Sequence, residues 1–314
     1  MKFKVFVDGS EGTTGLQINE RLAARNDLYI LKIDAEKRKD INERKKCLNQ
    51  ADVVFLCLPD AAAAEAVSLI DNPATRVIDA STAHRTNGDW AYGLPELSRH
   101  HRSKIENSAR VSVPGCYATG FISLMYPLVS EGLVQKDYPV TAHAISGYSG
   151  GGKKLIAQFE APGGNPFESP QLYALDLTHK HIPEMTVISG LKYAPLFSPI
   201  VCPYYKGMSV CVPVYPRLLQ KPLSKEDIHG FLTDYYSREK FIKVMPLGTE
   251  KEYINNFIGA TRVNNTNYIE IYVTGNTDQI MLVSVLDNLG KGSSGAAIQN
   301  MNIMLGLRED TGLI

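Results

Sequence analysis

The sequence predicts an α/β protein that begins with a doubly wound parallel sheet and continues into an α+β domain with a mixed or antiparallel sheet. Three observations support this prediction. Short apolar strands alternate with helices in the first half, a glycine-rich turn follows the first strand, and longer strands dominate after residue 116. A chain of 314 residues has room for two domains. We expect them at residues 1–115, completed by a C-terminal helix within 291–314, and at residues 116–290.

Strands and helices alternate through the first half of the chain. Strands are predicted where apolar and β-branched residues run together, and helices where apolar residues recur three or four positions apart. The predicted strands span residues 2–8, 28–33, 52–58 and 76–80. The predicted helices span residues 14–25, part of 34–46, and 60–70. Because parallel strands need crossover connections, this alternation indicates an open parallel sheet with helices on both faces.

The second half has longer strands and fewer helices between them. The predicted strands span residues 140–145, 186–188, 208–214, 240–244, 268–273 and 276–286. The predicted helices span residues 117–129, 153–159, 223–236 and 294–305. Long strands that follow one another closely are typical of a mixed or antiparallel sheet. The last helix is expected to return to the first domain.

Composition excludes several classes of protein. The formal net charge is zero, because 33 Lys and Arg balance 33 Asp and Glu, so neither nucleic acid nor a membrane surface is an expected partner. No apolar run is long enough to cross a bilayer, and the N-terminus enters a strand pattern without a signal-peptide core. We therefore expect a cytoplasmic protein. The five cysteines are odd in number and lack C-x-x-C spacing, so no disulfide framework or metal site is expected.

The glycine-rich turn follows the first strand and opens the first helix, which is where a dinucleotide-binding turn belongs in a Rossmann fold. Its residues, all candidates for cofactor binding, are Gly9, Ser10, Glu11, Gly12, Thr13, Thr14 and Gly15. Glycines permit a tight turn and let backbone N–H groups approach a pyrophosphate at the helix N-terminus. The spacing is the looser G-x-x-G-x-x-G, so a plain glycine-rich turn is the alternative.

The residues after the second strand leave the choice between NAD and NADP open. Asp34 lies 19 residues past Gly15, and an acidic residue near this distance favours NAD. Four basic residues that suit a 2′-phosphate surround it: Lys32, Lys37, Arg38 and Lys39.

Cys116 is the candidate nucleophile. A strand ends before it, Pro114 and Gly115 break that strand, and an apolar helix begins at the cysteine. A helix N-terminus favours the thiolate, which attacks acyl groups readily. A thiol combined with a nicotinamide site indicates reduction of an activated acyl group through a thioester. A buried structural cysteine is the alternative.

His179 and His181 are the candidate acid–base residues, because an i, i+2 pair in an extended segment presents both rings on one face. A surface pair and a weak metal site are the alternatives. His84, after the fourth strand, is a candidate for a place near cofactor or substrate. His100 and His101 lie in a charged run and are expected to be solvated.

A serine hydrolase is a rival interpretation from another class. Gly147, Ser149 and Gly151 fit the nucleophile elbow G-x-S-x-G, and Asp176 and His179 follow in hydrolase order. The glycine-rich turn would then have no role, and Asp176 lies only three positions before His179, which is too close for a hydrolase triad. The same loop also offers exposed backbone amides that suit a nicotinamide or a phosphate.

Seven segments together resemble N-acetyl-gamma-glutamyl-phosphate reductases, in particular the short-form subfamily, which is related to aspartate-semialdehyde dehydrogenases. They are residues 9–15, 79–85, 92–97, 113–119, 146–153, 179–184 and 287–292. The most specific are Pro-Gly-Cys-Tyr at 114–117 and Ser-Gly-Tyr-Ser-Gly-Gly-Gly-Lys at 146–153. Residues 288–292 are shared with the dehydrogenases, so a dehydrogenase-like acyl-phosphate reductase stays an alternative.

The resemblance implies a Rossmann domain with a dehydrogenase-like catalytic domain, NADP(H) as cofactor, a homo-oligomer and a step of arginine biosynthesis. In that reaction Cys116 displaces phosphate from N-acetyl-glutamyl 5-phosphate, and hydride from NADPH converts the thioester to the semialdehyde. His179 is the expected acid–base residue and His181 the second candidate. The expected substrate-binding residues are Arg85, Ser81 and Glu184. The residues expected near the nicotinamide are Ser146, Gly147 and Asn288.

Overall fold

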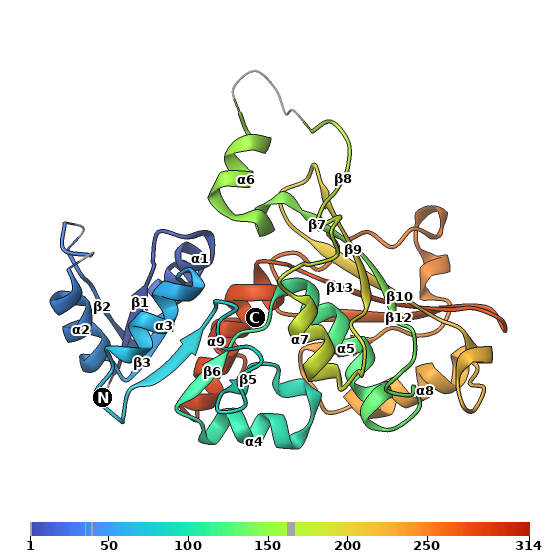
Figure 1. Ribbon diagram of the computed structural model, residues 1–314, viewed down its shortest axis with the longest axis horizontal. Coiled ribbons are helices and arrows are strands. Elements are labelled where there is room, and N and C mark those ends of the chain that lie inside the picture. The colour runs from blue at the N-terminus through green and yellow to red at the C-terminus, as the bar shows by residue number, and fades with distance from the viewer. Residues whose placement is uncertain (1, 35, 39, 162–166) are drawn as a thin grey trace. The chain divides into compact units, whose positions relative to one another are not determined.

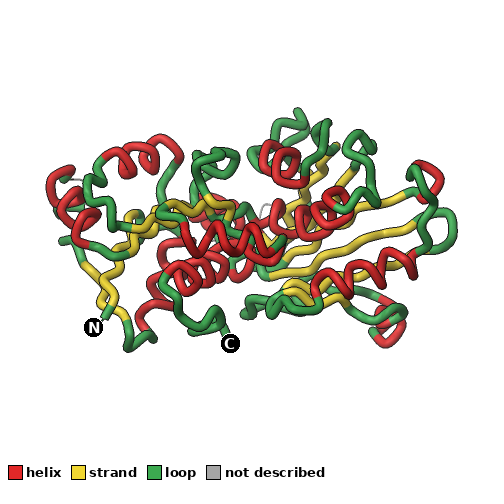
Figure 2. The backbone as a smooth tube through the Cα atoms, turned by 90° about the horizontal axis from the view of Figure 1, so that it is seen from below, coloured by secondary structure: helices red, strands yellow, loops and turns green. Residues whose placement is uncertain are grey.

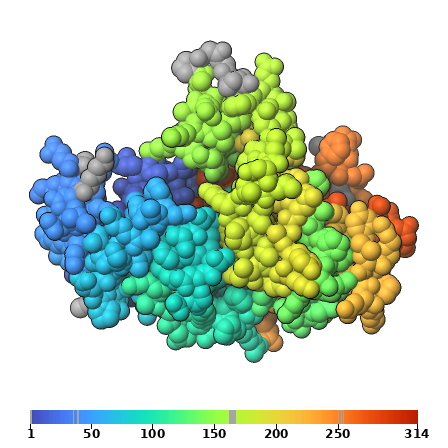
Figure 3. All heavy atoms as spheres, viewed as in Figure 1, coloured from blue at the N-terminus to red at the C-terminus, as the bar shows by residue number. Residues whose placement is uncertain are grey.

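The computed structural model describes residues 2–34, 36–38, 40–161 and 167–314; the others are grey in Figures 1 and 3. The chain divides into two compact units. Unit 1 comprises Met1–Gly115 and Ser293–Ile314, and unit 2 comprises Cys116–Gly292. No helix among the described residues is both long and apolar enough to cross a membrane.

Unit 1 contains a six-stranded sheet in the order β2-β1-β3-β4-β6-β5, and every strand pair in it is parallel. Its strands are β1 Phe3–Asp8, β2 Leu28–Leu31, β3 Val53–Leu56, β4 Arg76–Asp79, β5 Ala91–Tyr92 and β6 Arg110–Ser112. Strand β2 pairs with one edge of β1, and the later strands are added beyond its other edge, which is the doubly wound arrangement. The predicted α/β class with a Rossmann sheet is confirmed.

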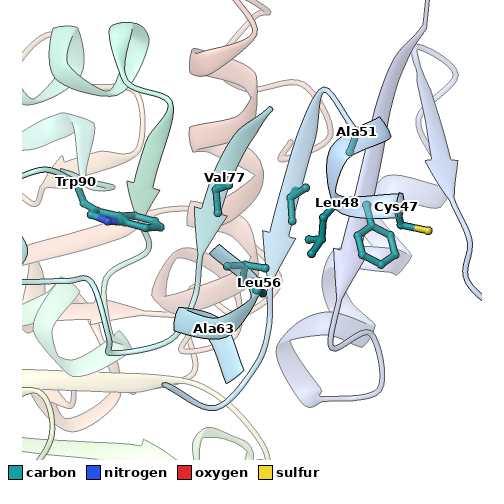
Figure 4. Close-up of a cluster of buried hydrophobic side chains, with 10 residues drawn as sticks. Cys47, Leu48, Ala51, Leu56, Ala63, Val77 and Trp90 are labelled. Atoms are coloured by element: carbon teal, nitrogen blue, oxygen red, sulfur yellow. The ribbon is translucent and has the colours of Figure 1, made fainter. Parts of the chain in front are cut away.

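The helices of unit 1 are α1 Thr13–Ala23, α2 Ile41–Gln50, α3 Asp60–Ser68, α4 Arg99–Asn107 and α9 Gly295–Met304, with one 3-10 turn at Pro95–Leu97. One hydrophobic core lies between the sheet and α2 and α3, with Leu48, Leu56 and Val77 at its centre and Trp90 at one side (Figure 4). The last helix is buried along its whole length. Asn300 Nδ2 donates to the carbonyl of Gly93 at 2.9 Å, so residues far apart in sequence are joined.

Unit 2 contains a seven-stranded mixed sheet in the order β11-β12-β13-β10-β7-β9-β8. Figure 2 draws strands in yellow and helices in red. Its strands are β7 Thr141–Gly147, β8 Gln171–Leu172, β9 Leu196–Cys202, β10 Met208–Val214, β11 Ile242–Val244, β12 Ile269–Gly275 and β13 Ile280–Leu286. The pairs β7/β9 and β11/β12 are parallel and the other pairs are antiparallel. The predicted mixed sheet is confirmed.

The helices of unit 2 are α5 Cys116–Ser130, α6 Gly152–Phe159, α7 Ile182–Ser189 and α8 Lys225–Tyr236. Short 3-10 turns occur at Tyr148–Gly151, Pro216–Leu218, Thr249–Glu252 and Ile254–Asn256. A π turn occurs at Gly290–Ser294. Helix α5 is apolar on nearly all sides and packs against β10 and β13. A Cβ atom at Gly120 would lie 2.7 Å from Ser284 Oγ and 2.8 Å from Val210 Cγ2. Only glycine therefore allows α5 to lie this close to the sheet.

Two predicted strands differ from the structure. Residues 186–188 belong to α7, although Thr186, Val187 and Ile188 are β-branched. Pro183 in its first turn and left-handed Gly190 at its C-cap favour the helix. These signals for the two helix ends outweigh the strand propensity of three β-branched residues. The strand predicted at 276–286 begins only at Ile280, because residues 276–279 form the turn of the β12–β13 hairpin.

Helix α4 was not predicted. Only Ile105 of its nine residues is fully buried, so no apolar period marks it in the sequence. Its start is fixed by Ser98, whose side chain accepts from His101 N. Of the two histidines predicted to be solvated, His100 is exposed and His101 is half-buried, and this burial lowers the pKa of the His101 imidazole to about 4.

Gly120→Ala should reduce the free energy of unfolding by about 1–3 kcal/mol, because the added methyl group overpacks the contact with the sheet. Gly230→Ala in α8 is the matched control. Its Cβ would meet nothing within 4 Å, so helix propensity alone should stabilise the protein by up to about 1 kcal/mol. Urea denaturation measures both changes, and equal effects at the two positions would contradict the packing account.

Candidate active site

The first and last glycines of the turn at residues 9–15 are required by the fold, because neighbouring backbone atoms leave no room for a Cβ. Gly9 has a φ of +85°, and its Cβ would lie 2.3 Å from the carbonyl oxygen of Cys57. A Cβ at Gly15 would lie 2.4 Å from the carbonyl oxygen of Gly9. These positions exclude side chains because β1, β3 and α1 approach one another closely there.

Gly12 is different, because the surrounding protein does not exclude a side chain there. The nearest atom to its Cβ position is 3.6 Å away, which is ordinary van der Waals contact. It is the N-cap of α1 and offers no side-chain cap, and the buried hydroxyl of Thr13 has no hydrogen-bond partner among the described residues. N–H groups without a side-chain cap and an unpartnered hydroxyl at a helix N-terminus fit a pyrophosphate.

Other residues of the turn have partners within unit 1. Thr14 Oγ1 is 3.1 Å from Ser293 Oγ, so this hydroxyl links the turn to the C-terminal segment. Glu11 is exposed, and its carboxylate is 3.6 Å from Arg38 Nη1. Arg38 therefore lies beside the turn, as a 2′-phosphate ligand would, whereas Lys39 lies outside the described residues.

The loop after β4 is held by one buried carboxylate. Asp79 accepts from Ser81 N at 2.9 Å, Ser81 Oγ at 2.6 Å and His84 Nδ1 at 2.6 Å. Because a carboxylate only accepts, the His84 proton is on Nδ1, and the ring stacks on Trp90 with centroids 4.0 Å apart. The hydroxyl of Ser81, predicted to bind substrate, is thus engaged in holding the loop. Arg85 is 8% exposed and donates from Nη2 to the Ala80 carbonyl at 3.1 Å.

Cys116 is the first residue of α5, as the Pro-Gly-Cys sequence predicts. Its Cβ lies beside the backbone of Gly292, where an added Cβ would be only 2.8 Å away. The sequence did not single out Gly292 for this contact, since 176 residues separate the two positions. All five cysteines are thiols, and burial raises the pKa of the other four: Cys47, Cys57 (to about 12), Cys202 and Cys211.

His179 and His181 lie together in unit 2, with ring centroids 4.7 Å apart and planes at 83°. They do so at the start of α7, where His181 is the N-cap, and not on an extended strand as the spacing suggested. The N–H of His181 donates to His179 Nδ1 at 3.1 Å. A backbone N–H cannot accept, so His179 Nδ1 is unprotonated and the neutral ring carries its proton on Nε2. Glu184 is buried in the first turn of α7.

Tyr117 and Tyr173 are site residues that sequence reasoning missed. Tyr117 follows the thiol, and its ring centroid is 5.7 Å from that of His179 and 5.9 Å from that of His181. Tyr173 donates from its hydroxyl to that of Tyr117 at 3.1 Å. The Pro-Gly-Cys-Tyr motif contains Tyr117, but nothing local in the sequence pairs it with Tyr173.

The side-chain amide of Asn288 makes hydrogen bonds within unit 2. Its Oδ1 accepts from Gly207 N at 2.8 Å, and its Nδ2 donates to Ser149 Oγ at 3.0 Å. Ser149 is 1% exposed, and Asp176 accepts from the hydroxyl of Thr178. The serine hydrolase interpretation gains no support from this arrangement. No group of three metal-ligating side chains occurs within the described ranges.

Comparison with known proteins agrees with these observations. Residues 6–105 match the family described as semialdehyde dehydrogenase, NAD binding domain, and residues 116–288 match semialdehyde dehydrogenase, dimerisation domain. Aspartate semialdehyde dehydrogenase II of Vibrio cholerae, complexed with ASA, shares the fold with a TM-score of 0.72 at 14% identity, over 98% of this chain and 99% of that one. The Candida albicans enzyme with NADP gives a TM-score of 0.68 at 16% identity, over 97% and 99%.

Curated relatives are much more similar in sequence. N-acetyl-gamma-glutamyl-phosphate reductase 2 of Nostoc sp. is 47% identical over 99% of both chains. The Pseudomonas putida protein of the same name is 46% identical over 96% of both chains. The predicted resemblance is confirmed, and the chain belongs to the N-acetyl-gamma-glutamyl-phosphate reductase family.

Proposed function

We propose that the protein reduces N-acetyl-glutamyl 5-phosphate to N-acetyl-glutamate 5-semialdehyde and phosphate, with NADPH, as a step of arginine biosynthesis. Membership of the reductase family gives the substrate class. The observation that carries the proposal is the placement of Cys116 at the start of α5, next to Tyr117, whose ring contacts both histidines. A nucleophile and two acid–base groups in one unit are what acyl transfer requires.

The turn at residues 9–15 is proposed to hold the cofactor. The N–H groups at the start of α1 and the hydroxyl of Thr13 would bind the pyrophosphate, and Arg38 would bind the 2′-phosphate of NADP. When bound, NADPH supplies the hydride for the acyl group. Asn288 would act indirectly, since its hydrogen bonds to Gly207 and Ser149 hold the loop that contains Ser146 and Gly147.

The protein residues handle the acyl group and the protons. Cys116 Sγ bonds to the acyl carbon of the substrate, the bond from that carbon to the phosphate oxygen breaks, and phosphate leaves. His181 takes the thiol proton and passes it to the oxygen of the departing phosphate. The Nε2–H of His179 donates to the acyl oxygen, which suits the protonation state fixed by the His181 N–H. After reduction the carbon–sulfur bond breaks and the thiolate is restored, while Arg85 provides a planar guanidinium for the anionic groups.

The reverse reaction is the direct test. Wild-type protein should reduce NADP with N-acetyl-glutamate 5-semialdehyde only when phosphate is present, and with aspartate semialdehyde at a far lower kcat/KM. Cys116→Ser should bind NADPH normally but lose activity by roughly three orders of magnitude or more. Equal rates with both aldehydes would favour the dehydrogenase-like alternative, and an active Cys116→Ser variant would rule out the thioester.

The cofactor turn gives a second test. Gly12→Ala should lower NADPH affinity by about tenfold or more, because a methyl group at the N-cap would crowd the N–H groups proposed to bind the pyrophosphate. The urea midpoint should fall only slightly, by the cost of alanine at an N-cap, since the new methyl group makes only ordinary contacts at 3.6 Å and beyond. Gly88→Ala, whose Cβ would meet nothing within 4 Å, is the control. Fluorescence titration with NADPH measures the affinity; an unchanged Kd would remove Gly12 from the site.

We further infer a cytoplasmic homo-oligomer. The dimerisation-domain description covers residues 116–288, and unit 2 exposes several large apolar side chains on and around β8, α7 and β9. They are Leu172, Leu175, Leu177, Val187, Tyr193 and Leu196. Light scattering should therefore give a mass of at least twice the 34.6 kDa of one chain, and a monomer at micromolar concentration would contradict the inference.

A further inference from the structure

Three hydroxyl groups from three separate segments of unit 2 lie close together. Tyr173 precedes the histidines, Tyr117 follows the thiol in α5, and Ser146 lies near the end of β7. Tyr173 donates to the Tyr117 hydroxyl at 3.1 Å, and the hydroxyl of Ser146 lies close enough to Tyr117 to offset part of the rise that burial causes in the pKa of that phenol. Ser146 in turn donates to the Gly147 carbonyl at 3.1 Å. We call these three side chains the hydroxyl network.

Two hydrogen bonds of the network have a defined direction. Tyr173 donates to the hydroxyl of Tyr117, and Ser146 donates to the carbonyl of Gly147. Burial raises the pKa of both tyrosines, and the nearby charge of Cys116 adds to this effect. The phenols therefore keep their protons, and Tyr117 and Ser146 are only 4% and 3% exposed.

The network also contacts both imidazoles. The ring of His179 lies 5.7 Å from Tyr117, 5.7 Å from Tyr173 and 5.2 Å from Phe197, measured between centroids. The ring of His181 lies 5.9 Å from Tyr117. If Tyr117 turned, both histidines would lose a packing surface. The hydrogen bond from Tyr173 and the packing of Phe197, with ring centroids 5.2 Å apart, both oppose that rotation.

We propose that Tyr173, Tyr117 and Ser146 are positioning residues, which hold the thiol, the two imidazoles and the Gly147 backbone in one arrangement. The inference rests on the proposed function only in one respect, namely that this arrangement serves the reduction of an acyl phosphate. The network acts through its neighbours, so it should determine how fast the bound substrate reacts and have little effect on how tightly substrates bind.

The test compares Tyr173→Phe, Tyr117→Phe and the double variant. Each single variant should lower kcat about 5- to 20-fold and leave both KM values within about twofold. The double variant should be no slower than the slower single variant, because either change breaks the same link. Tyr253→Phe is the matched control, since its hydroxyl also lies 3.1 Å from that of a second tyrosine, Tyr272, and kcat should not change.

A second readout does not depend on the substrate. Because burial raises the pKa of the other four thiols, iodoacetamide at pH 7 should label Cys116 first. Its labelling rate, followed by mass spectrometry, should fall severalfold in Tyr173→Phe and stay unchanged in Tyr253→Phe. Unchanged labelling and unchanged kcat in Tyr173→Phe would overturn the proposal, as would additive losses in the double variant. A wild-type protein without reductase activity would refute the proposed function, while labelling would still decide on the network.

Discussion

The close packing of α5 fixes where its first residue lies, and the rest of the site depends on that position. The helix is buried on nearly all sides, Gly120 leaves no space between it and the sheet, and Gly292 lies directly against Cys116. A helix held this tightly cannot shift by a fraction of a turn without opening cavities. The thiol is therefore placed by the hydrophobic core, and Tyr117 is placed with it. The imidazoles then take their positions from the aromatic rings around Tyr117.

Much of the fold follows from periodicity. In unit 1 short buried strands and intervening helices gave the parallel sheet, and in unit 2 long β-branched runs such as β10 and β13 gave the mixed sheet. The errors occur where the local pattern is weak or misleading. Three β-branched residues in α7 resemble a strand, but Pro183 and Gly190 set the ends of a helix. Helix α4 has one fully buried residue, so periodicity cannot reveal it.

For the candidate site, the sequence indicates residues that stand next to a diagnostic neighbour. Cys116 follows a Pro-Gly break, and the cofactor turn lies between a strand and a helix. The sequence does not reveal which hydrogen bonds a polar side chain makes within the folded protein. Ser81 is engaged by Asp79, Thr14 by Ser293 and Asn288 by Gly207, and each partner is set by folding. Such assignments depend on contacts between distant residues, which no local motif encodes.

Unit 1 is built from both ends of the chain, and this order of assembly has a consequence for synthesis. Unit 2 is complete once Gly292 has left the ribosome, whereas the Rossmann sheet still lacks α9 at that moment. That helix is buried along its whole length, and Gln299 and Asn300 bind Glu96 and Gly93, made about two hundred residues earlier. The cofactor-binding unit thus stays unfinished until α9 has been made, while the unit that contains the thiol can fold first.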